Sequence, residues 1–318
     1  MSSRAILARA AALALVVLAP APACAADPIY PLASHVGLVP PPAMKPSQRF
    51  RGFEDPATGA AILILEVPAQ AYAKVEKEMT PEALKKQGMT EEKRENVSLS
   101  TGKALLIAGE QVIDAKKTRK WVFLASGAEI GALIAVQVPD EARGKYSDAD
   151  VRTALMSLSV RASVPIDEQM RLLPISLDNL SGMRPFRVLP NGTLFLTNAD
   201  KDPPDVAAAP LLIISVVPGG PQDAGDRANF ARTLFTGFGD FKDLRIVSSD
   251  MLRLDNQQTH EIQAEAKDVK SGAPMKLVQW IRFGNGAFIR IVGMARADAW
   301  AQSFPQFRAV RDGVKPKG

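Results

Sequence analysis

The chain has 318 residues, a formal net charge of +5 and a single cysteine, Cys24. This length is typical of about two ordinary domains. One cysteine excludes an intramolecular disulfide framework and a multi-thiolate metal site, and the nearly balanced charge argues against a broad basic surface for nucleic acid.

The first 26 residues have the pattern of an export signal. Arg4 and Arg9 give a positive start, residues 10–18 are continuously apolar, and Ala23-Cys24-Ala25 resembles a cleavage site. The apolar run is too short to span a bilayer. We therefore expect residues 1–26 to be a signal peptide, and the mature chain to be periplasmic or secreted with a net charge of about +3 once Arg4 and Arg9 are removed.

Cys24 leaves one alternative open, a lipid anchor. The three residues before it, Ala21-Pro22-Ala23, lack the large aliphatic residue that bacterial lipoprotein signals usually place three positions upstream. If Cys24 leaves with the leader, the mature chain has no thiol. The richest remaining apolar run, Ala60 to Val67, is strand-sized, so no integral membrane span is expected in the mature chain.

The first half begins with turn chemistry at residues 55–59. The apolar run from Ala60 to Val67, stopped by Pro68, predicts a central strand covered on both faces. Thr80 as a cap, Pro81 at the first helical position and Gly88 at the end then predict a helix.

Short β-type runs follow the charged residues 91–95, at 97–100, 104–107 and 111–115. Residues 120–138 predict a hairpin around Ser126-Gly127-Ala128. Ser147 and Asp150 form a near capping box for a helix.

The second half repeats this order. Pro190-Asn191-Gly192 predicts a hairpin, and the run from Leu211 to Val217, stopped by Pro218, matches the first apolar run at an offset of 150 residues. A helix containing Phe230, Leu234 and Phe238 should follow. Further strands are expected at 244–248, 260–266, 276–283 and 287–294, and a last helix after Asp298, divided at Pro305.

The hairpin around Gly284-Asn285-Gly286 admits two registers. A two-residue loop would place Ile281 beside Arg290, whereas a three-residue loop aligns Ile281 with Ile289 and Trp280 with Arg290. Because the second register separates apolar from charged side chains, we predict it, with Arg290 stacked on Trp280.

The repeated order, together with Phe-Arg-Gly-Phe-Glu-Asp-Pro at Phe50 to Pro56 and the helices expected after Pro139 and Met294, resembles the PsbP-like superfamily. The resemblance spans 36–161 and 177–314. It implies an α+β fold, two tandem α/β/α sandwich domains, each with an antiparallel sheet and flanking helices. Members of that superfamily are mostly accessory or binding proteins rather than catalysts. No functional residue can be transferred, since no diagnostic motif matches.

We thus expect a first domain at 27–162, a linker at 163–171 and a second domain at 172–318. The linker carries Pro165, Asp167, Glu168 and Gln169, with little that a core could bury.

Motifs that would specify catalysis or a cofactor are missing. The sequence has no nucleophile elbow, P-loop or dinucleotide fingerprint. Its two histidines, His35 and His260, lie in different halves, and Glu261 points away from His260 if both are on a strand. The basic residues between Lys116 and Lys120 lack interleaved aromatics, so a solvated turn is expected. We therefore expect no catalytic residue, cofactor, metal or nucleic-acid partner.

One set of residues is a candidate for an apolar ligand pocket, although a core role is the simpler interpretation. It comprises Phe230, Phe235, Phe238, Trp300, Phe304 and Phe307. Three functions remain open: a non-catalytic accessory protein that presents sheet or inter-domain surfaces to an unknown protein partner in the cell envelope, a carrier of a small apolar or lipid ligand in the second domain, and a hydrolase.

Overall fold

The computed structural model describes residues 26–113, 115–237, 239–255 and 257–317. The expected signal peptide up to residue 25, Cys24 and Phe238 therefore lie outside the described residues. Across the described ranges, no helix combines the length and the apolar character needed to cross a membrane.

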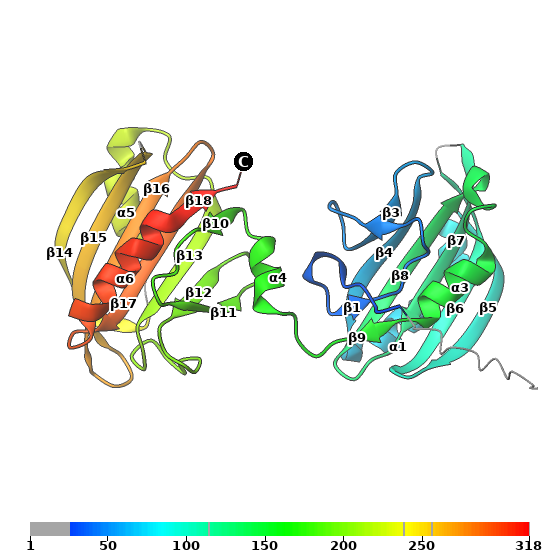
Figure 1. Ribbon diagram of the computed structural model, residues 1–318, viewed down its shortest axis with the longest axis horizontal. Coiled ribbons are helices and arrows are strands. Elements are labelled where there is room, and N and C mark those ends of the chain that lie inside the picture. Colours follow the sequence, from blue (N-terminus) through cyan, green and yellow to red (C-terminus); the bar gives the residue numbers. More distant parts are fainter. Residues whose placement is uncertain (1–25, 114, 238, 256, 318) are drawn as a thin grey trace, which may run out of the picture.

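The chain forms two lobes, each built on a seven-stranded antiparallel sheet (Figure 1). The first sheet has the order β2-β3-β4-β8-β7-β6-β5 and the second β11-β12-β13-β17-β16-β15-β14. Since every strand of one order has a counterpart in the other, the predicted pair of antiparallel α+β domains is confirmed.

The strands of the first lobe are β1 (Val36–Gly37), β2 (Lys45–Pro46), β3 (Gly52–Asp55), β4 (Ala60–Pro68), β5 (Met89–Leu99), β6 (Gly102–Ile113), β7 (Lys116–Ala125), β8 (Ile130–Pro139) and β9 (Ser159–Val160). Those of the second are β10 (Ile175–Leu177), β11 (Arg184–Val188), β12 (Leu194–Thr197), β13 (Leu211–Pro218), β14 (Phe241–Leu254), β15 (Gln257–Asp268), β16 (Pro274–Phe283), β17 (Ala287–Arg296) and β18 (Val314–Pro316). The pairs β1-β9 and β10-β18 form a small two-stranded sheet in each lobe.

Helices cover both faces of each sheet. The α-helices are α1 (Tyr72–Glu78), α2 (Pro81–Lys86), α3 (Asp148–Met156), α4 (Ile166–Arg171), α5 (Arg227–Thr236) and α6 (Trp300–Gly313), and the short 3-10 turns are η1 (Pro31–Ala33), η2 (Ala69–Ala71), η3 (Asp140–Ala142) and η4 (Ala224–Asp226). In the first lobe α3 packs on one face, and α1 and α2 on the other. In the second, α6 and α5 take the same opposed places. Each lobe is thus an α/β/α sandwich.

The local end signals of the sequence act as predicted. The Thr80 hydroxyl accepts a hydrogen bond from the Ala83 amide at 3.2 Å, and Ser147 and Asp150 form a reciprocal capping box. Gly192, with φ of 79°, takes the left-handed position of the turn between β11 and β12. These residues fix where elements begin and end, independently of the core.

Two predictions of element extent are wrong. The three short runs after residue 97 are parts of two long strands, β5 and β6, and the charged residues 91–95 belong to β5. An edge strand with mostly exposed side chains tolerates these charges. Pro305 does not divide the last helix, because α6 continues through it. A proline removes one backbone hydrogen bond, and burial of Phe307 and Val310 against the sheet supports the continuous helix.

The predicted register of the β16-β17 hairpin is also wrong. Ile281 pairs with Arg290 and Phe283 with Phe288, which leaves a two-residue turn at Asn285 and Gly286. The Arg290 guanidinium reaches Gln279 Oε1 and the Leu234 carbonyl oxygen under α5, both at 2.8 Å. The separation of polar from apolar residues does not determine this register. Both faces of the sheet are buried here, and the Arg290 guanidinium forms its hydrogen bonds inside the protein.

Candidate partner-binding surfaces

Strand β4 leaves two leucines open to solvent. Leu63 is 40% exposed and Leu65 60% exposed, on the sheet face that also carries α1 and α2. The prediction that this run is covered on both faces is therefore wrong. We call Leu63 and Leu65, with Leu133 paired beside Leu65 on β8, the β4 strip. Adjacent exposed leucines make this strip a candidate surface for binding another molecule.

The second lobe covers or replaces the matching positions. The β4-β8 ladder ends at the pair Pro68–Ile130, and the β13-β17 ladder ends at the pair Pro218–Ala287. When these end pairs are matched, Leu63 corresponds to Ile213 and Leu65 to the polar Ser215. Opposite Ile213 stands Phe195, whereas opposite Leu63 stands Gly52. The loop at 198–210 adds Val206 and Ala207 to the same cluster, while the corresponding turn at 56–59 of the first lobe is short. The β4 strip is thus a difference between the copies and not a property of the fold.

Gly52 keeps the strip open by backbone geometry. Its φ is +150°, and an added Cβ would lie 1.8 Å from the carbonyl oxygen of Ile62. No side chain fits at this close approach of two strands. A residue such as Phe195 therefore cannot cover Leu63 from this position.

A hollow of about 400 Å³ lies beside the strip, between β3 and β4, and reaches Leu63. Its charged side chains are already paired. Arg49 binds Glu54, and the buried Asp55 carboxylate accepts hydrogen bonds from Lys145 Nζ at 2.7 Å and from the Tyr146 hydroxyl at 2.6 Å. The hollow thus offers shape and apolar surface rather than an unsatisfied charge.

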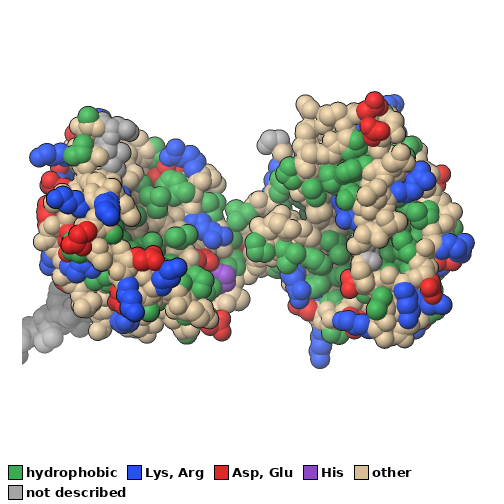
Figure 2. All heavy atoms as spheres, turned by 180° about the vertical axis from the view of Figure 1, so that it is seen from behind, with side chains coloured by type: hydrophobic (Ala, Val, Ile, Leu, Met, Phe, Trp, Pro, Cys, Tyr) green, Lys and Arg blue, Asp and Glu red, His purple; other side chains and the backbone are tan. Residues whose placement is uncertain are grey.

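A second hollow, of about 700 Å³, lies where the lobes meet, lined by residues of both and of the segment between them. Hydrophobic side chains gather around this junction (Figure 2). Leu172 and Leu189 contribute apolar surface, 49% and 36% exposed. Helix α4, within the segment predicted as a linker, contacts η1 on one side and β11 on the other.

The polar wall of this groove is organised by Glu66 of β4. The carboxylate accepts hydrogen bonds from the His35 amide at 2.7 Å and the Ser34 hydroxyl at 3.0 Å, and His35 Nδ1 lies 3.2 Å away. Burial alone would raise the Glu66 pKa, but these hydrogen bonds outweigh it and hold the pKa below its usual range. Glu66 is therefore an ionised clamp for the N-terminal segment. The sequence analysis did not predict the contact between Glu66 and His35. The one sequence feature that indicates it is an acidic residue inside an apolar strand.

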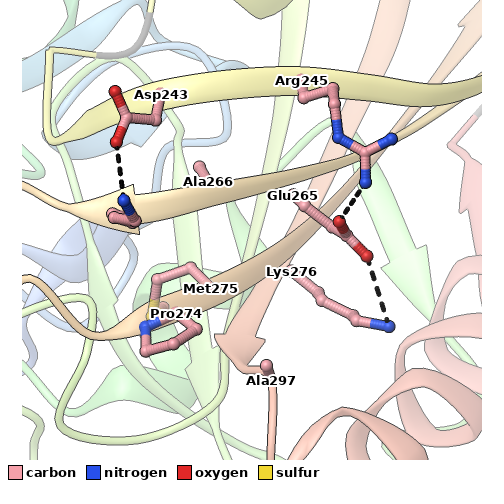
Figure 3. A pocket seen from close by; sticks show the side chains of 9 residues that line it. Asp243, Arg245, Glu265, Ala266, Pro274, Met275, Lys276 and Ala297 are labelled. Atoms are coloured by element: carbon pink, nitrogen blue, oxygen red, sulfur yellow. Dashed lines mark hydrogen bonds and ion pairs between the residues drawn. The ribbon is translucent and has the colours of Figure 1, made fainter.

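A charged hollow of about 410 Å³ lies at the start of β14, the end of β15 and the start of β16. Its side chains form a ladder of ion pairs (Figure 3). Glu265 pairs with Arg245 at 2.5 Å and with Lys276 at 3.8 Å, and Asp243 pairs with Lys267 at 3.0 Å. Such exposed pairs contribute little stability each, and their mutual pairing accounts for the charge without a ligand.

The predicted aromatic set does not form one cavity. Phe230 and Phe235 pack with α5 on one face of the second sheet, while Trp300, Phe304 and Phe307 pack with α6 on the other. Phe235 and Phe307 are fully buried, and Phe230 is half-buried. Phe238 lies outside the described residues. The sheet itself separates the two groups, and ligand binding by either stays a prediction.

His260 and Glu261 point to opposite faces of the second sheet, as the strand geometry predicts. His260 is buried on the α5 face, where Ser249 Oγ lies 3.2 Å from its Nε2, and burial lowers its pKa. Glu261 accepts a hydrogen bond from the Trp280 indole on the α6 face. Among the described residues, no group of three His, Cys, Asp or Glu side chains could hold a metal ion.

No family model matches the chain, and no curated protein matches it. Solved structures resemble it at low identity. Cyanobacterial PsbP from Synechocystis is 11% identical and covers 44% of this chain and 95% of its own, with a TM-score of 0.29. LpqN, described as involved in cell envelope biogenesis of Mycobacterium tuberculosis, is 15% identical over 45% and 83%, with a TM-score of 0.35. The T6SS immunity protein TplEi of Pseudomonas aeruginosa is 9% identical over 89% and 94%, with a TM-score of 0.28. These likenesses concern the fold.

Proposed function

We propose that this is a non-catalytic accessory protein, exported to the cell envelope or secreted, that binds a protein partner on the β4 strip of its first domain. The leader-like residues 1–26 support export. The resemblance of both domains to the PsbP-like superfamily and their division at 163–171 belong to the same proposal.

The observation that carries the proposal is the difference between Leu63 and its counterpart Ile213. The second domain covers this place with Phe195 and with Val206 of its own loop. We infer that the partner contributes an equivalent irregular apolar segment to the first domain. Since Leu63 is 40% and Leu65 60% exposed, covering the remaining surface would add about 1 kcal/mol for each side chain.

The test compares two exposed apolar residues on different sheets. Leu65→Asp places a charge in the strip, and Val247→Asp, at a 55% exposed residue of β14, is the matched control. Tagged wild type and both variants are used to capture proteins from the envelope fraction of the source cells. We expect one partner to be retained by wild type and Val247→Asp and reduced about tenfold or more by Leu65→Asp, at unchanged melting temperature. Equal capture by all three chains would reject the strip as the binding surface.

A further inference from the structure

A buried arginine lies in the wall of a fourth hollow, on the α6 face of the second domain. Arg282 is 4% exposed and lines a hollow of about 260 Å³ between the β10-β18 pair and the turn of the β16-β17 hairpin. Ile175, Val216 and Ile289 supply much of the apolar wall, and Gln257 and Asn285 add polar groups.

The guanidinium is only partly satisfied. Nη1 donates to the Val314 carbonyl oxygen at 2.8 Å and Nη2 to that of Arg311 at 3.3 Å, while Nε is buried with no partner. Within the described part of the chain, Arg282 forms no salt bridge: Asp255 and Asp312 attract its charge only from beyond contact distance, and the neighbouring Arg311 opposes it. A buried guanidinium that no carboxylate contacts is costly unless an anion binds beside it.

The first domain shows the same place filled differently. The strand pairings align Val216 with Glu66 and Arg282 with Ala125. In the first domain the carboxylate therefore comes from the chain itself, with Ser34 and His35 as donors. In the second domain an apolar residue replaces that carboxylate, and a cation replaces the alanine. The second domain therefore has no carboxylate at the place of Glu66, but it has an arginine beside that place that can bind one.

We propose that the second domain binds a small apolar carboxylate in this cavity, with the carboxylate on Arg282 and the apolar part against Ile175, Val216 and Ile289. The volume lies just below the range of drug-sized ligand pockets, which limits the ligand to roughly ten non-hydrogen atoms. An arginine fork is suited to a planar carboxylate. This site is separate from the β4 strip, so either proposal can fail without the other.

Hexanoate and benzoate are the probes, with 1-hexanol and benzamide as uncharged counterparts. Binding is followed by calorimetry and by the NMR signal of the Arg282 Nε-H group. We expect the two carboxylates to bind and to shift that signal, and their uncharged counterparts to bind at least about tenfold more weakly.

Three variants test separately whether binding needs the Arg282 charge, whether it needs the cavity, and whether loss of an unrelated arginine leaves it unchanged. Arg282→Ala restores the first-domain residue and should weaken hexanoate about tenfold or more. Val216→Phe fills the cavity while it keeps Arg282, so it should also abolish binding in a chain whose NMR spectrum stays folded. Arg245→Ala, in the exposed ion-pair ladder, should bind as wild type does. Failure of both carboxylates to bind the folded wild type at millimolar concentration, or unchanged binding by Val216→Phe, would overturn the proposal.

Discussion

The two domains share one strand order but differ in what fills the face under α3 and α6. In the first domain this face is an apolar cluster that includes Leu106 and Leu155. In the second, the pairings put Glu261 in the place of Leu106. Arg311 takes the place of Leu155. Leu155 lies five residues before Val160, which pairs with Val36, and Arg311 lies five residues before Pro316, which pairs with Ile175. The same topology thus forms around an apolar cluster with or without a buried ion pair in it.

The buried ion pair packs closely against an aromatic ring. Arg311 Nη1 lies 3.6 Å from Glu261 Oε2, and its guanidinium lies 4.9 Å from the Trp280 ring centroid. Trp280 also donates its indole N-H to Glu261 and stacks on Phe304. Strand alternation and turn positions therefore determine the fold, while the identity of the core residues determines which substitutions each domain tolerates.

The largest expected effect comes from breaking this pair. Glu261→Leu restores the first-domain residue but leaves Arg311 without Glu261 and the Trp280 indole without its acceptor. Because Arg311 keeps Asp312 at 2.7 Å, the loss should stay below that of a fully unpaired buried charge; we expect the second domain to lose about 2–3 kcal/mol. Urea denaturation followed by the indole NMR signals resolves the domains, because Trp121 reports the first and Trp280 and Trp300 the second. Glu265→Leu, on the same strand but 42% exposed, should change stability by less than about 1 kcal/mol.

A double variant sharpens this comparison. Glu261→Leu with Arg311→Leu gives the second domain both first-domain identities. Replacement of a whole buried ion pair by apolar residues is often neutral or stabilising, so the double variant should recover most of the loss of the single one. A double variant as unstable as the sum of both single ones would contradict the pairing, since independent sites add.

The next largest effect concerns acid, which should lower the stability of the first domain through Asp55. The Lys145 and Tyr146 hydrogen bonds hold the pKa of Asp55 well below its usual range, against the opposing effect of burial. A depressed pKa in the folded state means that the stabilisation is complete above the unfolded value, near 4, and is lost as the pH falls below it. The aligned residue of the second domain, Asn198, binds Gln306 and does not titrate.

We therefore expect the first domain to lose stability between about pH 4 and pH 2, and Asp55→Asn to flatten this dependence. Urea midpoints read from the Trp121 signal in wild type and variant measure the effect. Glu66, whose pKa is also lowered, remains in the variant, so part of the slope should persist. The same acid response in wild type and variant would remove Asp55 as its source.

Most of the architecture follows from short sequence signals. Pro68 and Pro218 end matching strands, and the turns at 190–192 and 126–128 place two hairpins. These signals are local, so they survive without knowledge of the core. The register at Asn285 was not predictable in this way, because it depends on Gln279 and the Leu234 carbonyl oxygen, which contact Arg290 from elsewhere in the fold.

The candidate surfaces were less accessible from sequence. The run from Ala60 to Val67 reads the same whether a neighbour covers it or not. Its exposure depends on Gly52 of the adjacent strand and on the short turn at 56–59. In the same way, the partners of Glu66 lie about thirty residues earlier in the chain. Contacts between distant segments decide both features, and one sequence does not display them.

The smallest expected effect tests whether the β4 strip is open in solution. Leu63→Ala should cost at most about 0.5 kcal/mol, because the side chain is exposed in the free protein. Ile213→Ala, at the aligned place under Phe195, should cost about 1–2 kcal/mol, less than at a fully buried site. Urea denaturation of the two variants, resolved by the same indole signals, gives the difference. An equal cost at both positions would mean that Leu63 is already covered, in which case no partner segment is needed to explain its side chain.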